Sequence, residues 1–187
     1  SRRAGRPRTT RVLCGVAQNI YDDEAFFAEY GRLPRSAHGL EAAPEWPIMR
    51  AMLPPAHDLR VLDLGSGLGW FTRWAAAQGA TSVLGIDLSE RMLAAARQTT
   101  TAPQVGYERQ DLDHLTLTPA AFDVAYSSLT LHYLVDLPGF LDAVYRALVP
   151  GAYGRRERWL AIGITAICFT AGPVIMFVAS LFLSLEP

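Results

Sequence analysis

The chain has 187 residues, of which half are hydrophobic and 19% are charged, and its formal net charge is −1. This length fits one domain with a sizeable core. The near-neutral charge argues against a polyanionic partner, so we expect no nucleic acid. The two cysteines, Cys14 and Cys168, lie too far apart to indicate a disulfide framework or a metal site.

The first segments precede any regular alternation of strands and helices. Residues 1–11, SRRAGRPRTTR, contain five arginines and no acid, and we expect residues 1–17 to form a disordered basic extension. The stretch YDDEAFFAEY (21–30) predicts a short helix with Asp22 or Asp23 as its N-cap. The next stretch, 31–44, is rich in Gly and Pro and predicts a loop. EWPIMRAML (45–53) predicts a helix that ends before Pro54.

From residue 60 onward, short apolar strands alternate with helices. Strands are predicted at 60–64, 82–87, 105–110 and 122–128, and helices at 70–79, 89–98 and 137–151. This alternation is typical of βαβ units with a parallel sheet that is buried on both faces. The predicted fold is α/β, a Rossmann-like doubly wound sheet.

A glycine-rich loop follows the first predicted strand directly. In VLDLGSGLGW (61–70), Gly65, Ser66, Gly67 and Gly69 lie between that strand and a helix. Ligands bind at the carboxyl ends of strands in such sheets, and glycines let backbone N–H groups approach an anion near a helix N-terminus. A tight turn without any ligand is the alternative interpretation.

Three acids at neighbouring strand ends favour a nucleoside that carries an amino acid. Asp87 ends the second strand, where a carboxylate can accept hydrogen bonds from two ribose hydroxyls. Asp111 follows the third strand and could accept from an exocyclic amine. Asp63 precedes the glycines and could bind an ammonium group, while loop N–H groups bind a carboxylate.

Five linked motifs resemble those of the class I S-adenosylmethionine-dependent methyltransferases, from about residue 18 to 151. They are VLDLGSGLGW, VLGIDLSERML, YERQDLDHL, FDVAYSSLTLHYL and LVPGA. The resemblance implies S-adenosylmethionine as cofactor and a small molecule as methyl acceptor. It implies that the cofactor's methionine part lies among Asp63, Gly65, Gly67 and Gly69, and its ribose at Asp87. It places Leu88, Asp111 and Leu112 at the adenine and Ser127 and Ser128 near the sulfur.

Residues outside the nucleoside motifs are weaker candidates. His132, after the fourth strand, is a candidate general base for the acceptor, and a packing role is the alternative. Tyr21 and Arg35 precede the sheet in a segment that often covers the cofactor in this family. Both could line the pocket. In the alternative interpretation, Tyr21 packs at the start of the helix and Arg35 lies in solvent. Trp70 and Trp74, at i, i+4 spacing, are expected in the core.

The tail departs from the family pattern after Gly151. Residues 152–158 form a charged linker, and 159–185 contain no charged residue. This run exceeds the roughly 20 residues that span a bilayer, and we expect a transmembrane helix with its arginine-flanked end in the cytoplasm. The sheet would then be incomplete after its fourth strand. The rival interpretation is two buried segments, WLAIGITAICFT and VIMFVASLFLSL, that turn at Gly172-Pro173 and replace part of the sheet.

The sequence therefore predicts a truncated methyltransferase domain (18–151) that faces the cytoplasm and is anchored to a membrane by its tail. It would transfer a methyl group from S-adenosylmethionine to an unidentified small molecule. The alternative is a non-catalytic membrane protein that carries a remnant cofactor-binding domain.

Overall fold

The structure is a computed structural model that describes residues 19–150, 159–168 and 175–182. The predicted basic extension (1–17) and the charged linker (152–158) lie outside the described residues.

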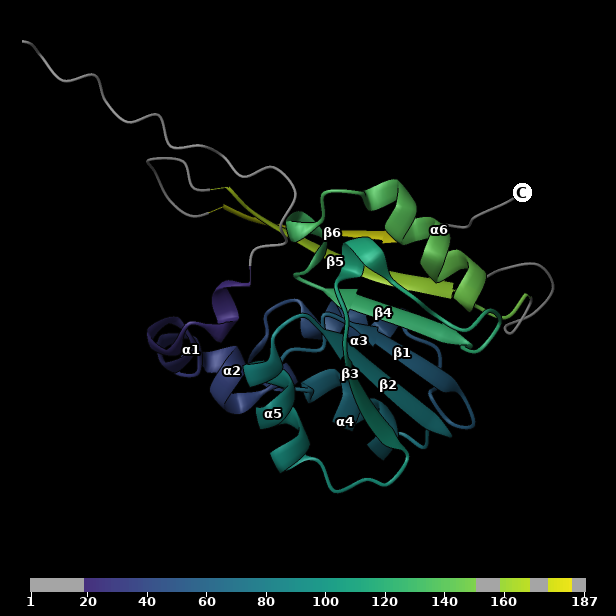
Figure 1. The fold of residues 1–187 in the computed structure, drawn as a ribbon, viewed down its shortest axis with the longest axis horizontal. Helices are drawn as coiled ribbons and strands as arrows, with labels where there is room; N and C mark the ends of the chain where they lie inside the picture. Colours follow the sequence, from purple (N-terminus) through teal and green to yellow (C-terminus); the bar gives the residue numbers. More distant parts are fainter. Residues whose placement is uncertain (1–18, 151–158, 169–174, 183–187) are drawn as a thin grey trace, which may run out of the picture.

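One six-stranded sheet forms the centre of the fold, in the order β3-β2-β1-β4-β5-β6 (Figure 1). Its strands are β1 (Arg60–Leu64), β2 (Ser82–Asp87), β3 (Val105–Arg109), β4 (Val124–Ser128), β5 (Trp159–Cys168) and β6 (Ile175–Phe182). Strands β1 to β5 are parallel, and β6 is antiparallel to β5. The four central predictions, β1 to β4, are confirmed, and the Rossmann-like α/β class is confirmed with them.

Helices connect and cover the strands. They are α1 (Glu24–Tyr30), α2 (Pro34–His38), α3 (Trp46–Met52), α4 (Trp70–Ala77), α5 (Glu90–Thr99) and α6 (Leu137–Ala147). Short 3-10 turns are η1 (Ile20–Asp22), η2 (Leu40–Ala42), η3 (Leu112–His114) and η4 (Leu131–Tyr133). Ser89 and Asp136 cap α5 and α6, because their side chains accept hydrogen bonds from the Met92 and Gly139 N–H groups.

The strand sequences are apolar on both sides because both faces of the sheet are covered. Val61 and Val83 pack with α3 and α4 on one face, in a cluster with Trp46 and Phe71. Leu62 of β1 and Ile86 of β2 pack on the other face of the sheet against α6. Successive side chains of a strand point to opposite faces, so this pattern produces a buried sheet between two helical layers.

The N-terminal segment is more helical than predicted. Asp23 caps α1 by accepting a hydrogen bond from the Phe26 N–H at 2.9 Å. The predicted loop 31–44 is wrong in part, because it contains α2 and η2. Pro34 occupies the first helical position of α2, where its missing N–H removes no intrahelical bond. A proline thus begins a helix here, whereas the prediction treated it as a loop residue.

The tail contradicts the predicted transmembrane helix. Residues 159–168 and 175–182 are strands, and β5 pairs with β4 from Val124↔Trp159 to Ser128↔Gly163. No helix within the described ranges has the length and hydropathy needed to cross a bilayer. An unpartnered β4 would expose a row of backbone N–H and C=O groups, and pairing with β5 satisfies them. The prediction of a sheet that stops after β4 is therefore wrong. The two tail strands extend the sheet, as the rival interpretation expects, while its turn at 172–173 lies outside the described residues.

Candidate functional site

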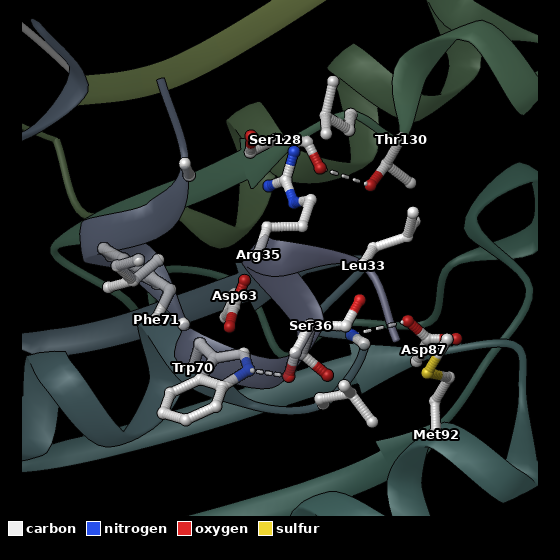
Figure 2. A pocket seen from close by; sticks show the side chains of 18 of the residues that line it. Leu33, Arg35, Ser36, Asp63, Trp70, Phe71, Asp87, Met92, Ser128 and Thr130 are labelled. Carbon is white, nitrogen blue, oxygen red and sulfur yellow. Dashed lines mark hydrogen bonds between the residues drawn. The ribbon is translucent and has the colours of Figure 1, made fainter. Parts of the chain in front are cut away.

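A cavity of about 420 Å³ lies at the carboxyl ends of β1 and β4. These two strands mark the point where the strand order reverses, which is where ligands bind in open α/β sheets. The cavity walls come from the glycine loop after β1, the segment after β4, and the N-terminal elements η1 to η2 (Figure 2). The fold thus brings together segments that are far apart in the sequence.

The glycine loop is shaped by positive φ angles at Gly65 (78°), Gly67 (51°) and Gly69 (73°). A Cβ on Gly65 would lie 2.8 Å from Thr130 Cβ, whereas a Cβ on Gly67 would meet no atom within 4 Å. Gly65 is therefore required by close packing, and Gly67 presents its backbone to open space. Both line the cavity, as does Ser66, whose Oγ is buried without a hydrogen-bond partner among the described residues.

The N–H groups of this loop already have partners within the protein. Gly65 and Ser66 donate to the Ile86 carbonyl at 2.8 and 2.9 Å, and Gly69 donates to the Ser66 carbonyl at 2.8 Å. Gly67 donates to Asp87 Oδ2 at 2.8 Å. Four of the five loop N–H groups are thus engaged within the protein, and the expectation that the loop binds a carboxylate stays a prediction.

Asp87 lies at the end of β2 and lines the cavity. Its Oδ1 accepts from the Ser89 N–H at 2.9 Å, and its Oδ2 accepts from Gly67. Burial raises the pKa of Asp87 above its ordinary value, and these backbone hydrogen bonds oppose that shift. The bonds fix the carboxylate and leave it further acceptor capacity, because each of its oxygens has two lone pairs.

Asp63 is almost fully buried, with 2% of its surface exposed, at the bottom of the cavity. Burial raises the pKa of Asp63 to about 7, and Thr72 Oγ1 opposes this by donating to Oδ2 at 2.6 Å. When a cation binds beside a carboxyl group with such a raised pKa, the opposite charge lowers that pKa and the group loses its proton. Asp63 is therefore suited to an ammonium group.

The structure places some predicted residues in the cavity and others outside it. Besides the acids and loop residues above, Tyr21, Ser128 and His132 line the cavity. Ser127 does not, because its Oγ donates to the Leu64 carbonyl at 2.8 Å inside the core. Asp111 accepts from the Asp113 N–H and contacts His114, and it does not line the cavity. Leu88, Leu112 and Gly69 are also outside the set of lining residues.

Aromatic side chains of α4 and β4 also line the cavity, and the sequence did not predict this position for them. Trp70 lines the cavity and donates from Nε1 to the Ser36 carbonyl at 3.2 Å, so its predicted core position is wrong. Trp74 packs against the core, as predicted. Tyr126 stacks on Phe71 with ring centroids 3.6 Å apart, and burial raises the pKa of its phenol. The i, i+4 spacing could not distinguish Trp70 from Trp74, since the contact of Trp70 with Ser36 of α2 is distant in sequence.

Polar side chains from α2 and the following turn also reach the cavity. Arg35 lines the cavity, which is one of the two positions that the sequence left open for it. Its Nη1 forms an ion pair with Glu45 Oε1 at 2.9 Å. Sequence reasoning missed Glu45, which is 3% exposed. A lone Glu beside a helix start carries no signal for burial, because charged side chains at such positions are usually solvated.

This arrangement fits a nucleoside that carries an amino acid. The carboxyl groups of Asp63 and Asp87 line one cavity and can accept hydrogen bonds from ribose hydroxyls and an ammonium group, and the Ser66 Oγ, which has no hydrogen-bond partner among the described residues, offers a further polar contact. A pyrophosphate would be repelled by so many carboxyl groups. Within the described residues, no group of three or more His, Cys, Asp or Glu is arranged to hold a metal ion.

Comparisons with known proteins agree with this geometry. A family model for a methyltransferase domain matches residues 62–154. The crystal structure of an S-adenosylmethionine-dependent methyltransferase from Mesorhizobium loti is 41% identical, with a TM-score of 0.64. The match covers 75% of this chain and 67% of that one.

Two curated relatives cover less of their own length. An uncharacterized protein of Haemophilus influenzae is 32% identical over 136 residues, which cover 70% of this chain and 54% of that protein. The malonyl-[acyl-carrier protein] O-methyltransferase of Pectobacterium atrosepticum is 37% identical over 101 residues. That match covers 54% of this chain and 39% of the relative, so the chain spans about half or less of the curated relatives it matches. The family implies S-adenosylmethionine as cofactor, and the chain belongs to the class I S-adenosylmethionine-dependent methyltransferases.

Proposed function

We propose that this chain binds S-adenosylmethionine in the cavity and transfers its methyl group to a small acceptor. The observation that carries this proposal is the joint presence of Asp63, Asp87 and the glycine loop around one cavity. When bound, the cofactor supplies an electrophilic methyl group on a sulfonium, so the chain's own residues need only bind, orient and exclude water.

Each part of the cavity then has a task. Asp87 accepts hydrogen bonds from the ribose, and Asp63 binds the ammonium group of the methionine part. Ser128 ends β4 and lines the cavity, where it would lie beside the sulfur of a bound cofactor. Tyr21 closes this side, because its hydroxyl hydrogen-bonds that of Tyr133 at 2.9 Å. This contact joins η1 to η4 across 112 residues.

His132 is the proposed base for an acceptor that must lose a proton. It lies in η4, lines the cavity, and has a pKa that burial lowers below its ordinary value. A lowered pKa keeps the imidazole neutral near pH 7, so that it can accept a proton.

The acceptor atom favoured by the relatives is oxygen. Among the curated relatives, proteins of Pectobacterium atrosepticum and Erwinia pyrifoliae are named malonyl-[acyl-carrier protein] O-methyltransferases, with 37% and 40% identity over the matched residues. We propose an oxygen acceptor on a small or carrier-linked acyl group. The alternative of a non-catalytic membrane remnant rested on a transmembrane helix at 159–185 and on a sheet that ends at β4. Residues 159–168 and 175–182 are strands instead, and β5 pairs with β4.

Calorimetric titration with S-adenosylhomocysteine tests the cofactor site. The wild-type protein should bind it, and Asp87→Ala should weaken binding by about ten- to a hundredfold, because hydrogen bonds to a charged group are lost. Asp142→Ala is the matched control, since Asp142 is an exposed acid on α6 that pairs with Arg146. A folded wild-type sample that does not bind would overturn the proposal, and equal affinities of wild type and Asp87→Ala would remove the ribose assignment.

A further inference from the structure

Arg35 carries the only permanent positive charge among the described residues that line the cavity. Its side chain is 29% exposed, and its Nη1 lies 2.9 Å from Oε1 of the buried Glu45. A guanidinium has five N–H donors in one rigid plane. The pair with Glu45 therefore orients the group and leaves other donors for a ligand.

An anionic ligand group in this cavity needs a donor outside the glycine loop. Such loops usually bind anions through backbone N–H groups. Here four of the five N–H groups from Gly65 to Gly69 donate to Ile86, Asp87 or Ser66 instead. The side chains of Glu45, Asp63 and Asp87 add negative charge to the cavity. Arg35 is thus the cationic counterpart that an anionic group would meet.

The position of Arg35 separates it from the proposed ribose site. Figure 2 shows its guanidinium directed into the cavity on the side of Ser128 and Asp63, with Asp87 and Met92 on the other side. This end of the cavity therefore holds a positive and a negative side chain close together, which suits a zwitterion or a carboxylate beside a cation.

We infer that Arg35, oriented by Glu45, is a carboxylate-binding site within the cavity, an inference that rests on the proposed function. A carboxylate is planar and accepts two parallel hydrogen bonds from a guanidinium. Two sources bring a carboxylate to this end: the methionine part of the cofactor, whose ammonium group would pair with Asp63, and an acceptor that carries its own carboxylate.

The test compares two variants of the full chain. Arg35→Met alone would leave Glu45 buried without a partner, which is strongly destabilising. Glu45→Gln therefore serves as the background, and the double variant Arg35→Met/Glu45→Gln is compared with it. The probes for calorimetry are S-adenosylhomocysteine, methylthioadenosine, which has the nucleoside and thioether without the amino acid, and malonate added to protein saturated with S-adenosylhomocysteine. Thermal melting confirms that both variants fold.

The outcomes separate the two sources. If the cofactor supplies the carboxylate, loss of Arg35 weakens S-adenosylhomocysteine binding by about ten- to a hundredfold and leaves methylthioadenosine binding unchanged. If the acceptor supplies it, both nucleosides bind unchanged, and malonate binds the Glu45→Gln variant and not the double variant. The inference is overturned if neither S-adenosylhomocysteine nor malonate distinguishes the two variants. Wild-type protein that binds neither nucleoside would instead overturn the proposed function, and the carboxylate site with it.

Discussion

Gly65 and Gly67 lie two residues apart in one loop and are expected to respond differently to the same substitution. Both have positive φ angles, which cost a residue with a Cβ about 1–2 kcal/mol. Only at Gly65 does the new Cβ collide, because it would lie 2.8 Å from Thr130 Cβ and closer still to the other two Thr130 side-chain atoms. Forcing extra atoms into a packed site costs typically about 1–3 kcal/mol more.

Gly65→Ala should therefore lower the free energy of unfolding by about 2–5 kcal/mol, and Gly67→Ala by about 1–2 kcal/mol. Urea unfolding followed by tryptophan fluorescence measures both. Thr130→Gly removes the colliding atoms. In the Thr130→Gly background, Gly65→Ala should therefore lower the free energy of unfolding by only about 1–2 kcal/mol, the cost of the positive φ angle. Gly67→Ala should instead weaken S-adenosylhomocysteine binding, since its methyl group points into open space at the cavity. Equal destabilisation by the two alanines would refute this reasoning.

Two further predictions concern titratable groups in the cavity. The pKa of Asp63 rises from an ordinary 3.8 to about 7 in the folded protein, so the folded state holds a proton that the unfolded state releases above pH 4. Stability should consequently fall as pH rises from about 4 to 7, and Asp63→Asn should remove on the order of 2–4 kcal/mol of that fall. Urea unfolding at pH 5 and 8 measures it, and an unchanged pH dependence in the variant would contradict it. The pKa of His132 should lie below its ordinary value of 6.5 in a proton–carbon NMR titration. The His132 signal is identified as the one that disappears in the His132→Gln variant. A midpoint at or above 6.5 would argue against a neutral imidazole at pH 7 as base.

The central strands and their helices could be predicted because their signals are local. A strand such as 60–64, apolar at nearly every position, is typical of a parallel sheet with two covered faces. Ser89 and Asp136 are placed before helices where a side-chain oxygen can accept from the first free N–H groups. Asp63 and Asp87 lie near or at the ends of β1 and β2, and Gly65 and Gly67 follow β1. Parallel strands bring their carboxyl ends to one edge of the sheet.

The tail and the N-terminal segment could not be predicted in the same way. Residues 159–185 contain no charge, and hydropathy alone does not distinguish a membrane helix from strands buried in a sheet. The decision came from β4, whose unpaired edge requires a neighbour. Likewise α2 contains Pro34 and ends at Gly39, and its helical state depends on packing over the cavity more than on propensity.

The order of strands and helices from 60 to 147, and the acids and glycines near their ends, could be predicted because they depend on residue spacing along one segment. Which of those residues share a cavity depends on the tertiary structure. Ser127 and Asp111 do not line the cavity, whereas Trp70, Arg35 and Glu45 do. The N–H groups of Gly65, Ser66 and Gly67 donate to Ile86 or Asp87. The reason is that burial and hydrogen-bond partners depend on neighbours that are distant in sequence, which no local pattern encodes.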